Sequence, residues 1–406
     1  MTTEPTPSRG PGADGPPRRL FAAGLIGRTA NEMTPVAVVL LVLARGEGVA
    51  IAGVTAGALA LPGVITGPVL GAWLDRARRP LRVIAAEQVI GAAGLGTLAV
   101  AVGHVPAALT ILLAAVTGAL QPLSTGGMTG VLTGLSDEEY LPRATSFEAA
   151  SFGTASVAGP MLAALLAGVA GAAFAVATQS VLKAMAVVVT TGASGAPLGR
   201  ADAARATEPI GATVAAGFRH FARRGPLAAV TVTGSMVMAG RGLFTVAFPL
   251  YAMHELGHGQ SFAGVLWAAF AAGSAVGALG LTSRTARWPS QWVVVAGAAL
   301  AGIVLAPVAL VAVSVIAVVL LAAAGALYGP SLAATFDVRR RFTPARFLGQ
   351  VFTTAASVKN GSFAAGAAVS GAVVAGLGAT ETIALGAGIH LVGALAGAVL
   401  LESSAR

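Results

Sequence analysis

Long apolar stretches separated by short polar segments occupy almost the whole chain. A helix that crosses a bilayer needs about 20 predominantly apolar residues. The first stretch is too long for the apolar core of a signal peptide, so we interpret it as a spanning helix. The pattern predicts an all-α integral membrane protein with twelve transmembrane helices, over residues 20–44, 50–74, 82–103, 107–131, 144–169, 171–192, 227–252, 261–282, 291–312, 314–336, 347–375 and 381–401.

Composition supports this interpretation. The chain is 56% hydrophobic and only 10% charged, whereas soluble domains are about 25% charged. So few charges would not cover the surface of a soluble fold of this size. The 54 glycines fit close packing between membrane helices. The chain contains no cysteine, which excludes disulfides, thiolate chemistry and cysteine-ligated metals.

The basic residues predict the orientation. Twenty of the 25 Lys and Arg residues lie in the tails or in the loops that join an even-numbered span to the next odd-numbered one, and the opposite loops contain only Arg45. The positive-inside rule therefore predicts a multi-pass protein of the cell (inner) membrane with both termini in the cytoplasm. It also accounts for the net charge of +9 without a nucleic-acid partner.

The spans divide into two halves. We expect a disordered cytoplasmic tail at residues 1–19, an N-terminal six-helix bundle at 20–192 and a C-terminal six-helix bundle at 227–401. The connecting segment 193–226 is expected to be a cytoplasmic linker, in which residues 210–224 form an amphipathic helix at the membrane surface, and residues 402–406 a short tail.

Matching features indicate a pseudo-twofold repeat. The Gly-Ala-Leu sequence at 118–120 recurs at 325–327, and Pro142 and Pro344 stand at the start of the fifth and eleventh spans. Repeated membrane halves are typical of transporters, which bind substrate near the midplane between the repeats.

A basic signature follows the second span. It consists of Gly71, Asp75, Arg76, Arg78 and Arg79. This pattern resembles the loop signature of the major facilitator superfamily, and the loop at 280–287 is a degenerate copy without the Asp. The resemblance implies that the signature braces a cytoplasmic gate; retention of topology by clustered arginines is the simpler reading, and the two are compatible.

The fifth span contains Gly153, Gly159 and Pro160. These residues resemble the Gly-Pro motif of bacterial efflux permeases within that superfamily, with a different spacing, and a plain helix-packing bend is the alternative. The arginine that related proton-coupled drug exporters carry in the fourth span is absent. Gln121 is the only strongly polar side chain in the middle of that span.

Ionisable and amide side chains inside spans are the candidate substrate or proton-coupling residues, because a charge there costs at least about 2.5 kcal/mol. They are Arg28, Asn31 and Glu32 in the first span, Arg241 in the seventh, and Lys359 and Asn360 in the eleventh, together with Gln121. The resemblance implies that the first, fourth, seventh and tenth helices line the cavity, and that the sixth, with Gln179 and Lys183, is a scaffold. Glu87 and Glu148 are expected in interfacial charge networks.

The sign of these charges bears on the substrate. Four intramembrane cations face one midplane acid, Glu32, and such a cavity favours anionic solutes. Alternatively, Glu32 alternates between a proton and an arginine partner, which would be a minimal coupling device. The chain has two lysines against 23 arginines, and both lysines are intramembrane. This bias and the heavy use of Ala and Gly are typical of a GC-rich bacterium.

We therefore expect a secondary active transporter that works by alternating access as a monomer. The first hypothesis is a proton-coupled antiporter that exports a metabolite or drug-like compound; the alternative is an uptake permease for an anionic nutrient or metabolite. No cofactor or metal is expected. A non-transporting receptor, a channel and a membrane-embedded enzyme are remote: His254, Glu255 and His258 match a zinc-protease spacing, but neighbouring glycines predict a loop there.

Overall fold

The computed structural model describes residues 16–75, 77–129, 131, 141–192, 225–343 and 348–405. These residues are helical apart from their connections, and twelve of the helical segments within them are long and apolar enough to cross a membrane. The prediction of an all-α membrane protein with twelve spans is confirmed.

Six spans form the first half. They are α1 (Pro16–Ala44), α2 (Val49–Asp75), α3 (Pro80–Ala101), α4 (Ala107–Ala119) with the π-helical η1 (Leu123–Gly127), α6 (Leu141–Ala170) and α7 (Ala172–Gly192). Helix α1 begins at Pro16, so it includes four residues that were expected in the tail.

Six more spans form the second half. They are α9 (Gly225–His254), α10 (Ala263–Thr285) after the short η3 (Gln260–Phe262), α11 (Ser290–Leu305) with η4 (Ala306–Leu310), α12 (Ser314–Tyr328) with α13 (Ser331–Arg341), α14 (Leu348–Leu377) and α15 (Ala379–Ala405). Helix α15 thus includes residues 402–405, expected as a tail. The linker residues 193–224, with their predicted amphipathic helix, lie outside the described residues.

Two connections consist of one glycine each. Gly171 joins α6 to α7 with φ of +93°, and Gly378 joins α14 to α15 with φ of +102°. This left-handed backbone is open to glycine at little steric cost. The equivalent position of the two turns, between the fifth and sixth spans of each half, is a further mark of the repeat.

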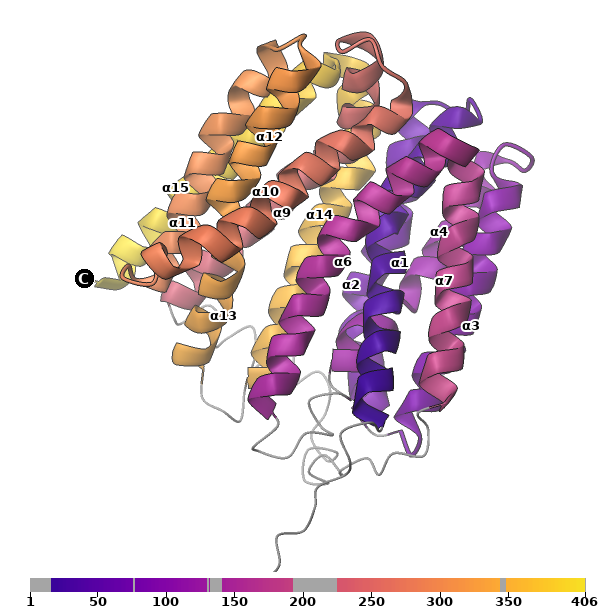
Figure 1. Ribbon diagram of the computed structural model, residues 1–406, viewed down its shortest axis with the longest axis horizontal. Coiled ribbons are helices and arrows are strands. Elements are labelled where there is room, and N and C mark those ends of the chain that lie inside the picture. Colours follow the sequence, from indigo (N-terminus) through magenta and orange to yellow (C-terminus); the bar gives the residue numbers. More distant parts are fainter. Residues whose placement is uncertain are drawn as a thin grey trace, which may run out of the picture.

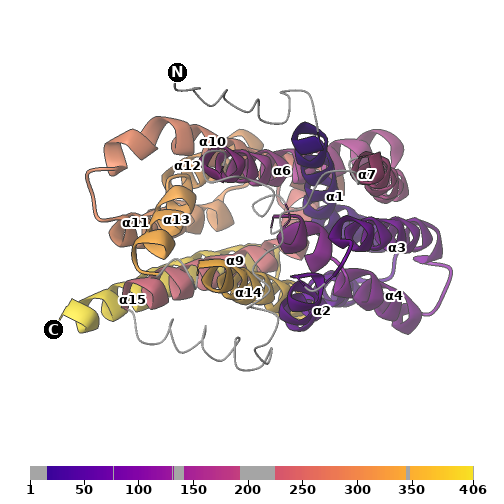
Figure 2. The same ribbon diagram turned by 90° about the horizontal axis from the view of Figure 1, so that it is seen from below.

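The two halves lie side by side (Figures 1 and 2), with α2 packed along α14 and α6 against α10. Small residues allow the close approach: a Cβ on Gly57 would collide with Ala368, and one on Gly264 with Ala164. We call the end of the molecule that contains the connections 77–79 and 286–289 the arginine-rich face, and the end that contains 45–48 and 255–259 the arginine-poor face.

An unusually close contact holds α10 to α12. A Cβ on Gly273 or Gly277 of α10 would collide with a backbone carbonyl of α12, and one on Gly325 would collide with the carbonyl of Phe270 in α10. The two helices therefore touch backbone to backbone. We call these three glycines the α10–α12 seam.

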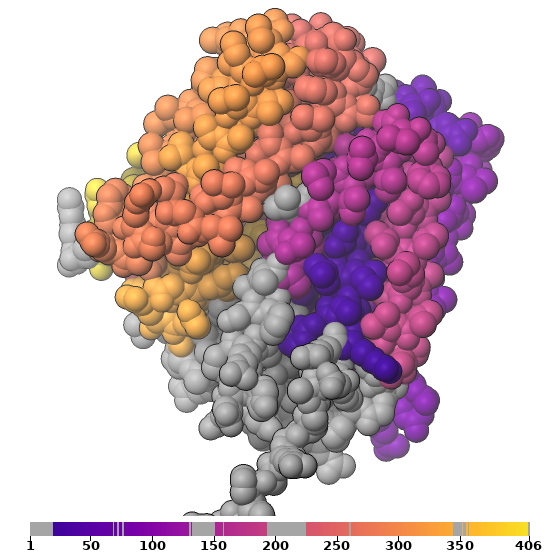
Figure 3. Space-filling view, viewed as in Figure 1, coloured from indigo at the N-terminus to yellow at the C-terminus, as the bar shows by residue number. Residues whose placement is uncertain are grey.

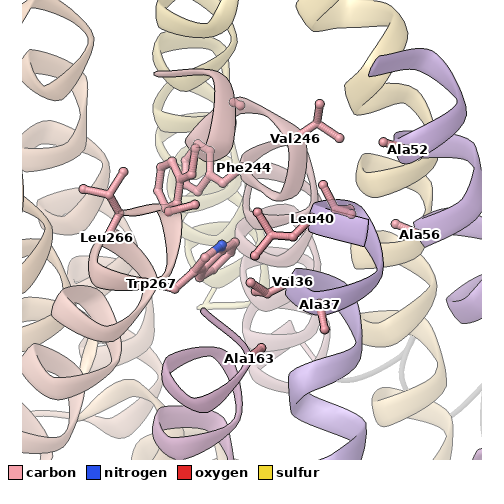
Figure 4. Close-up of a cluster of buried hydrophobic side chains, with 14 of the residues drawn as sticks. Val36, Ala37, Leu40, Ala52, Ala56, Ala163, Phe244, Val246, Leu266 and Trp267 are labelled. Atoms are coloured by element: carbon pink, nitrogen blue, oxygen red, sulfur yellow. The ribbon is translucent and has the colours of Figure 1, made fainter. Parts of the chain in front are cut away.

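An apolar cluster spans both halves toward the arginine-poor face (Figure 4). Val36 and Leu40 of α1 and Ala163 of α6 are buried with Phe244 of α9 and Trp267 of α10, and Trp267 lies between Phe244 and α1. On the surface of the molecule, α6 and α10 meet (Figure 3). We call this cluster the apolar seal.

Candidate functional site

Charged residues from both halves come together just below the apolar seal. Glu32 lies one helical turn before Val36 on α1, and Arg241 lies one turn before Phe244 and Thr245 on α9. Glu32 interacts electrostatically with Lys359 of α14 and with Arg241. Three predicted site residues, far apart in the sequence, are therefore one cluster.

These three charges lack hydrogen-bond and ion-pair partners among the described residues. Within the part of the chain that the structure describes, Glu32, Arg241 and Lys359 make no hydrogen bond and no ion pair within 4 Å. All three keep part of their accessible surface. An uncompensated charge at this depth is costly, so these three side chains stay the candidate substrate or proton-coupling residues.

Aromatic rings form one wall beside Arg241. Its guanidinium carbon lies 5.5 Å from the ring centre of Trp267 and 5.2 Å from that of Phe270, both on α10. Cation–π contacts of this kind hold a guanidinium in place while leaving its N–H groups available to an anion. Sequence reasoning missed this wall, although Trp267 and Phe270 are three residues apart and so share a helix face.

Glu32 also marks the contact between α1 and α6. A Cβ on Gly159 would lie 2.6 Å from Cβ of Glu32 and 2.8 Å from its carbonyl carbon. The glycine of the predicted Gly-Pro motif therefore lets α6 touch α1 at the candidate coupling residue. Gly153, by contrast, has no such neighbour within 4 Å.

Two other predicted site residues, Asn31 and Gln121, are joined by a hydrogen bond. Gln121 Nε2 donates to Asn31 Oδ1 at 3.2 Å, and Asn31 Nδ2 donates to Ser124 Oγ at 3.3 Å. Gln121 lies where α4 gives way to the π-helix η1 beside Pro122. Such π segments are frequent at functional sites.

Arg28 occupies a different environment. It is 1% exposed, donates to Ser151 Oγ and, at 2.9 Å, to Thr129 Oγ1, and lies 4.1 Å from the ring centre of Phe152. Although it shares a helix face with Glu32, it is packed inside the first half. The structure brings Glu32, Arg241 and Lys359 together and leaves Arg28 buried apart; Asn360, next to Lys359, is exposed.

Lys183 is bound to Glu87. Its Nζ lies 2.7 Å from Glu87 Oε1, between α7 and α3, and both side chains are almost fully buried. Gln179, one turn away on α7, accepts a hydrogen bond from Thr34 of α1 at 3.2 Å. This pair fits the expected scaffold role of the sixth span, whereas the expected place of Glu87 in an interfacial network gives way to a buried ion pair.

The remaining sequence features are placed as follows. Gly71 and Asp75 belong to the last turn or so of α2, Arg78 and Arg79 are exposed in the following connection, and Arg76 and the side chain of Glu148 lie outside the described part. Helix α9 ends at His254. His254 and His258 are therefore not held on one helix, and no group of three metal-ligating side chains occurs among the described residues.

Comparison with known proteins agrees with this architecture. Residues 20–358 match the Major Facilitator Superfamily. An uncharacterized MFS-type transporter, y4rN, of Sinorhizobium fredii (strain NBRC 101917 / NGR234) is 26% identical over 361 residues, which are 87% of each chain.

Solved structures share the fold at low sequence identity. The nucleoside transporter NupG (D323A mutant) has a TM-score of 0.74 at 14% identity and covers 95% of this chain and 100% of its own. A POT family transporter in complex with a thioalcohol-conjugated peptide has a TM-score of 0.72 at 13% identity, with 96% of both chains covered. The chain belongs to the major facilitator superfamily and is a secondary transporter, not an enzyme.

Proposed function

We propose that the protein transports a small organic anion and that protons drive this transport through Glu32. The observation that supports the proposal is the cluster of Glu32, Arg241 and Lys359, contributed by both halves, whose members make no hydrogen bond or close ion pair with any described residue. Two cations face one acid, so the cluster has room for one further negative charge.

The coupling follows from competition for the two cations. An ionised Glu32 and an anionic solute both seek Arg241 and Lys359. When the solute binds, Glu32 loses their attraction and takes up a proton more readily; when the solute leaves, the proton is released. Proton and anion therefore bind together, which corresponds to cotransport.

The apolar seal sets the direction of access. Because the seal lies between the cluster and the arginine-poor face, we infer that the solute reaches the cluster from the arginine-rich face. The positive-inside rule makes that face cytoplasmic in a cell (inner) membrane. Alternating access requires the seal to open and the arginine-rich face to close.

Glu32→Gln tests the proposal. Substrates are first selected by comparing metabolite secretion and resistance in deletion and overexpressing cells, and labelled hits are then measured in proteoliposomes. Gln resembles protonated Glu, so we expect flux driven by a pH gradient to fall at least about tenfold while exchange of labelled for unlabelled solute persists. Glu255→Gln, which alters an exposed acid at the arginine-poor face, is the matched control. Unchanged gradient-driven flux in Glu32→Gln would refute the coupling role.

Export by proton exchange is the second candidate. It is favoured by the Gly159–Pro160 pair, which resembles an exporter motif and whose Gly159 packs against Glu32. Export in exchange for a proton requires solute and proton to compete rather than to bind together. Label that accumulates in intact energised cells supports cotransport, and label that is depleted supports export.

A further inference from the structure

A groove opens on the outer surface of the first half, near the arginine-rich face. It lies between α2, α3 and the junction of α4 with η1, and its volume is about 680 Å³. Its apolar walls include Leu70, Trp73, Ile90 and Leu120, and Arg78, Arg79 and Arg82 line it as well. Every lining residue belongs to the first half, so the groove is separate from the cluster between the halves.

The groove is positively charged. The side chains of Arg78, Arg79 and Arg82 are exposed, and none makes a hydrogen bond or an ion pair with any described residue. Glu87, the one acid among the described residues that line the groove, is neutralised by Lys183 at 2.7 Å. The N-terminus of α3 lies here too and has no side-chain cap, which adds a partial positive charge.

Its position matches the boundary between lipid tails and headgroups. The apolar span of α3 begins at Pro80, between the arginines. Trp73 is 51% exposed, and tryptophan favours the membrane interface. Ile90 lies more than two helical turns farther into the span than Arg82 and is also exposed.

From this combination we propose that the groove binds an anionic phospholipid of the surrounding membrane. Guanidinium groups pair with phosphate oxygens through two parallel hydrogen bonds. The acyl chains would cover Leu70, Ile90 and Leu120. A soluble phosphate would leave those apolar walls unoccupied, which is why the structure favours a lipid.

Quenching by brominated lipid tests the site through Trp73. The reporter chain keeps Trp73 and replaces the other three tryptophans by Trp267→Phe, Trp288→Phe and Trp292→Phe. It is reconstituted in phosphatidylcholine vesicles with rising shares of dibrominated phosphatidylglycerol or dibrominated phosphatidylcholine. We expect phosphatidylglycerol to be preferred by about fivefold or more, the effect of about one arginine near a membrane surface.

Two triple variants decide the origin of that preference. In Arg78→Gln/Arg79→Gln/Arg82→Gln, the ratio of phosphatidylglycerol binding to phosphatidylcholine binding should fall to about one. Arg284→Gln/Arg287→Gln/Arg340→Gln removes the same charge from exposed positions on the same face and should keep the preference. A preference that survives the first triple variant, or that the second removes equally, overturns the proposal.

A second measurement does not depend on the tryptophan replacements. Native mass spectrometry of the otherwise unaltered chain, released from mixed micelles, should show retained phosphatidylglycerol that is lost in the groove triple variant and kept in the control. Equal retention of phosphatidylglycerol in all three proteins would contradict the site.

Discussion

The charged side chains inside the spans differ in whether another side chain neutralises them. Glu32, Arg241 and Lys359 have no hydrogen-bond or ion-pair partner among the described residues, whereas Lys183 and Glu87 form a buried pair at 2.7 Å. Gly91 lies against this pair: a Cβ there would come within 2.9 Å of Lys183 Nζ. The pair is therefore enclosed within the first half, and we assign it a structural role.

A double substitution tests that role. Lys183→Met leaves the Glu87 charge buried without its partner, so we expect a loss of about 3–5 kcal/mol in the free energy of unfolding. Glu87→Leu/Lys183→Met removes both charges and should recover most of that loss. Denaturant unfolding in detergent micelles measures the difference. A stable double variant whose transport no longer responds to a pH gradient would instead assign the pair to coupling.

The sequence allowed the intramembrane charges to be identified, but not which of them are free. The cost of burying a charge marks Arg28 and Glu32 equally, and they are one helical turn apart. Their environments differ because Ser151, Thr129 and Phe152 surround Arg28. Those neighbours come from other spans, and nothing in the local sequence of the first span specifies them.

Among the helices, the contact of α6 with α1 is the most sensitive to added volume. Gly159→Ala places a methyl group 2.6 Å from Cβ of Glu32, so we expect a destabilisation of about 1–3 kcal/mol and a fall in transport. Gly153→Ala, with open space around it, should be neutral or stabilising by up to about 1 kcal/mol. Thermal unfolding and flux in proteoliposomes compare the two; equal effects would contradict this account.

The α-helix is interrupted within three spans, at positions that the hydropathy pattern does not predict. The breaks lie between α4 and η1, between α11 and η4, and between α12 and α13, and each has a proline beside it: Pro122, Pro307 and Pro330. Proline removes a helical hydrogen bond and crowds the preceding turn. Apolar residues continue through each break, so hydropathy alone predicts one uninterrupted span.

At the scale of the whole molecule, the proposed alternating access requires the halves to separate at the arginine-poor face. Gly168 of α6 and Ser261 of η3 lie on opposite halves, and a Cβ on Gly168 would be 3.2 Å from Cβ of Ser261. This is close to disulfide geometry. The chain has no native cysteine, so the variant Gly168→Cys/Ser261→Cys carries the only two thiols. Oxidation of this variant should lower the transport rate at least about tenfold, and a reductant should restore it.

A disulfide within one half is the control. A Cβ on Gly96 of α3 would lie 3.8 Å from Cβ of Ser180 of α7, so Gly96→Cys/Ser180→Cys should also oxidise while transport continues. Gel mobility and flux before and after reduction report both pairs. Full transport with the inter-half disulfide formed would show that this face does not open.

The two-half architecture was predictable because the halves repeat sequence marks, such as Gly-Ala-Leu at 118–120 and 325–327. The packing of α2 on α14 and of α6 on α10 was not. It depends on pairs such as Gly57 with Ala368, and glycine and alanine are too frequent in this chain to identify partners by themselves.

The α10–α12 seam also limits how this half of the protein can evolve. Every single-nucleotide missense change of a glycine codon introduces a side chain, and at Gly273, Gly277 and Gly325 even a methyl group meets the backbone of the other helix. No conservative replacement exists at such a site. Sequence drift in α10 and α12 therefore has to leave these three positions unchanged, whereas residues on the other faces of the two helices can vary without separating their backbones.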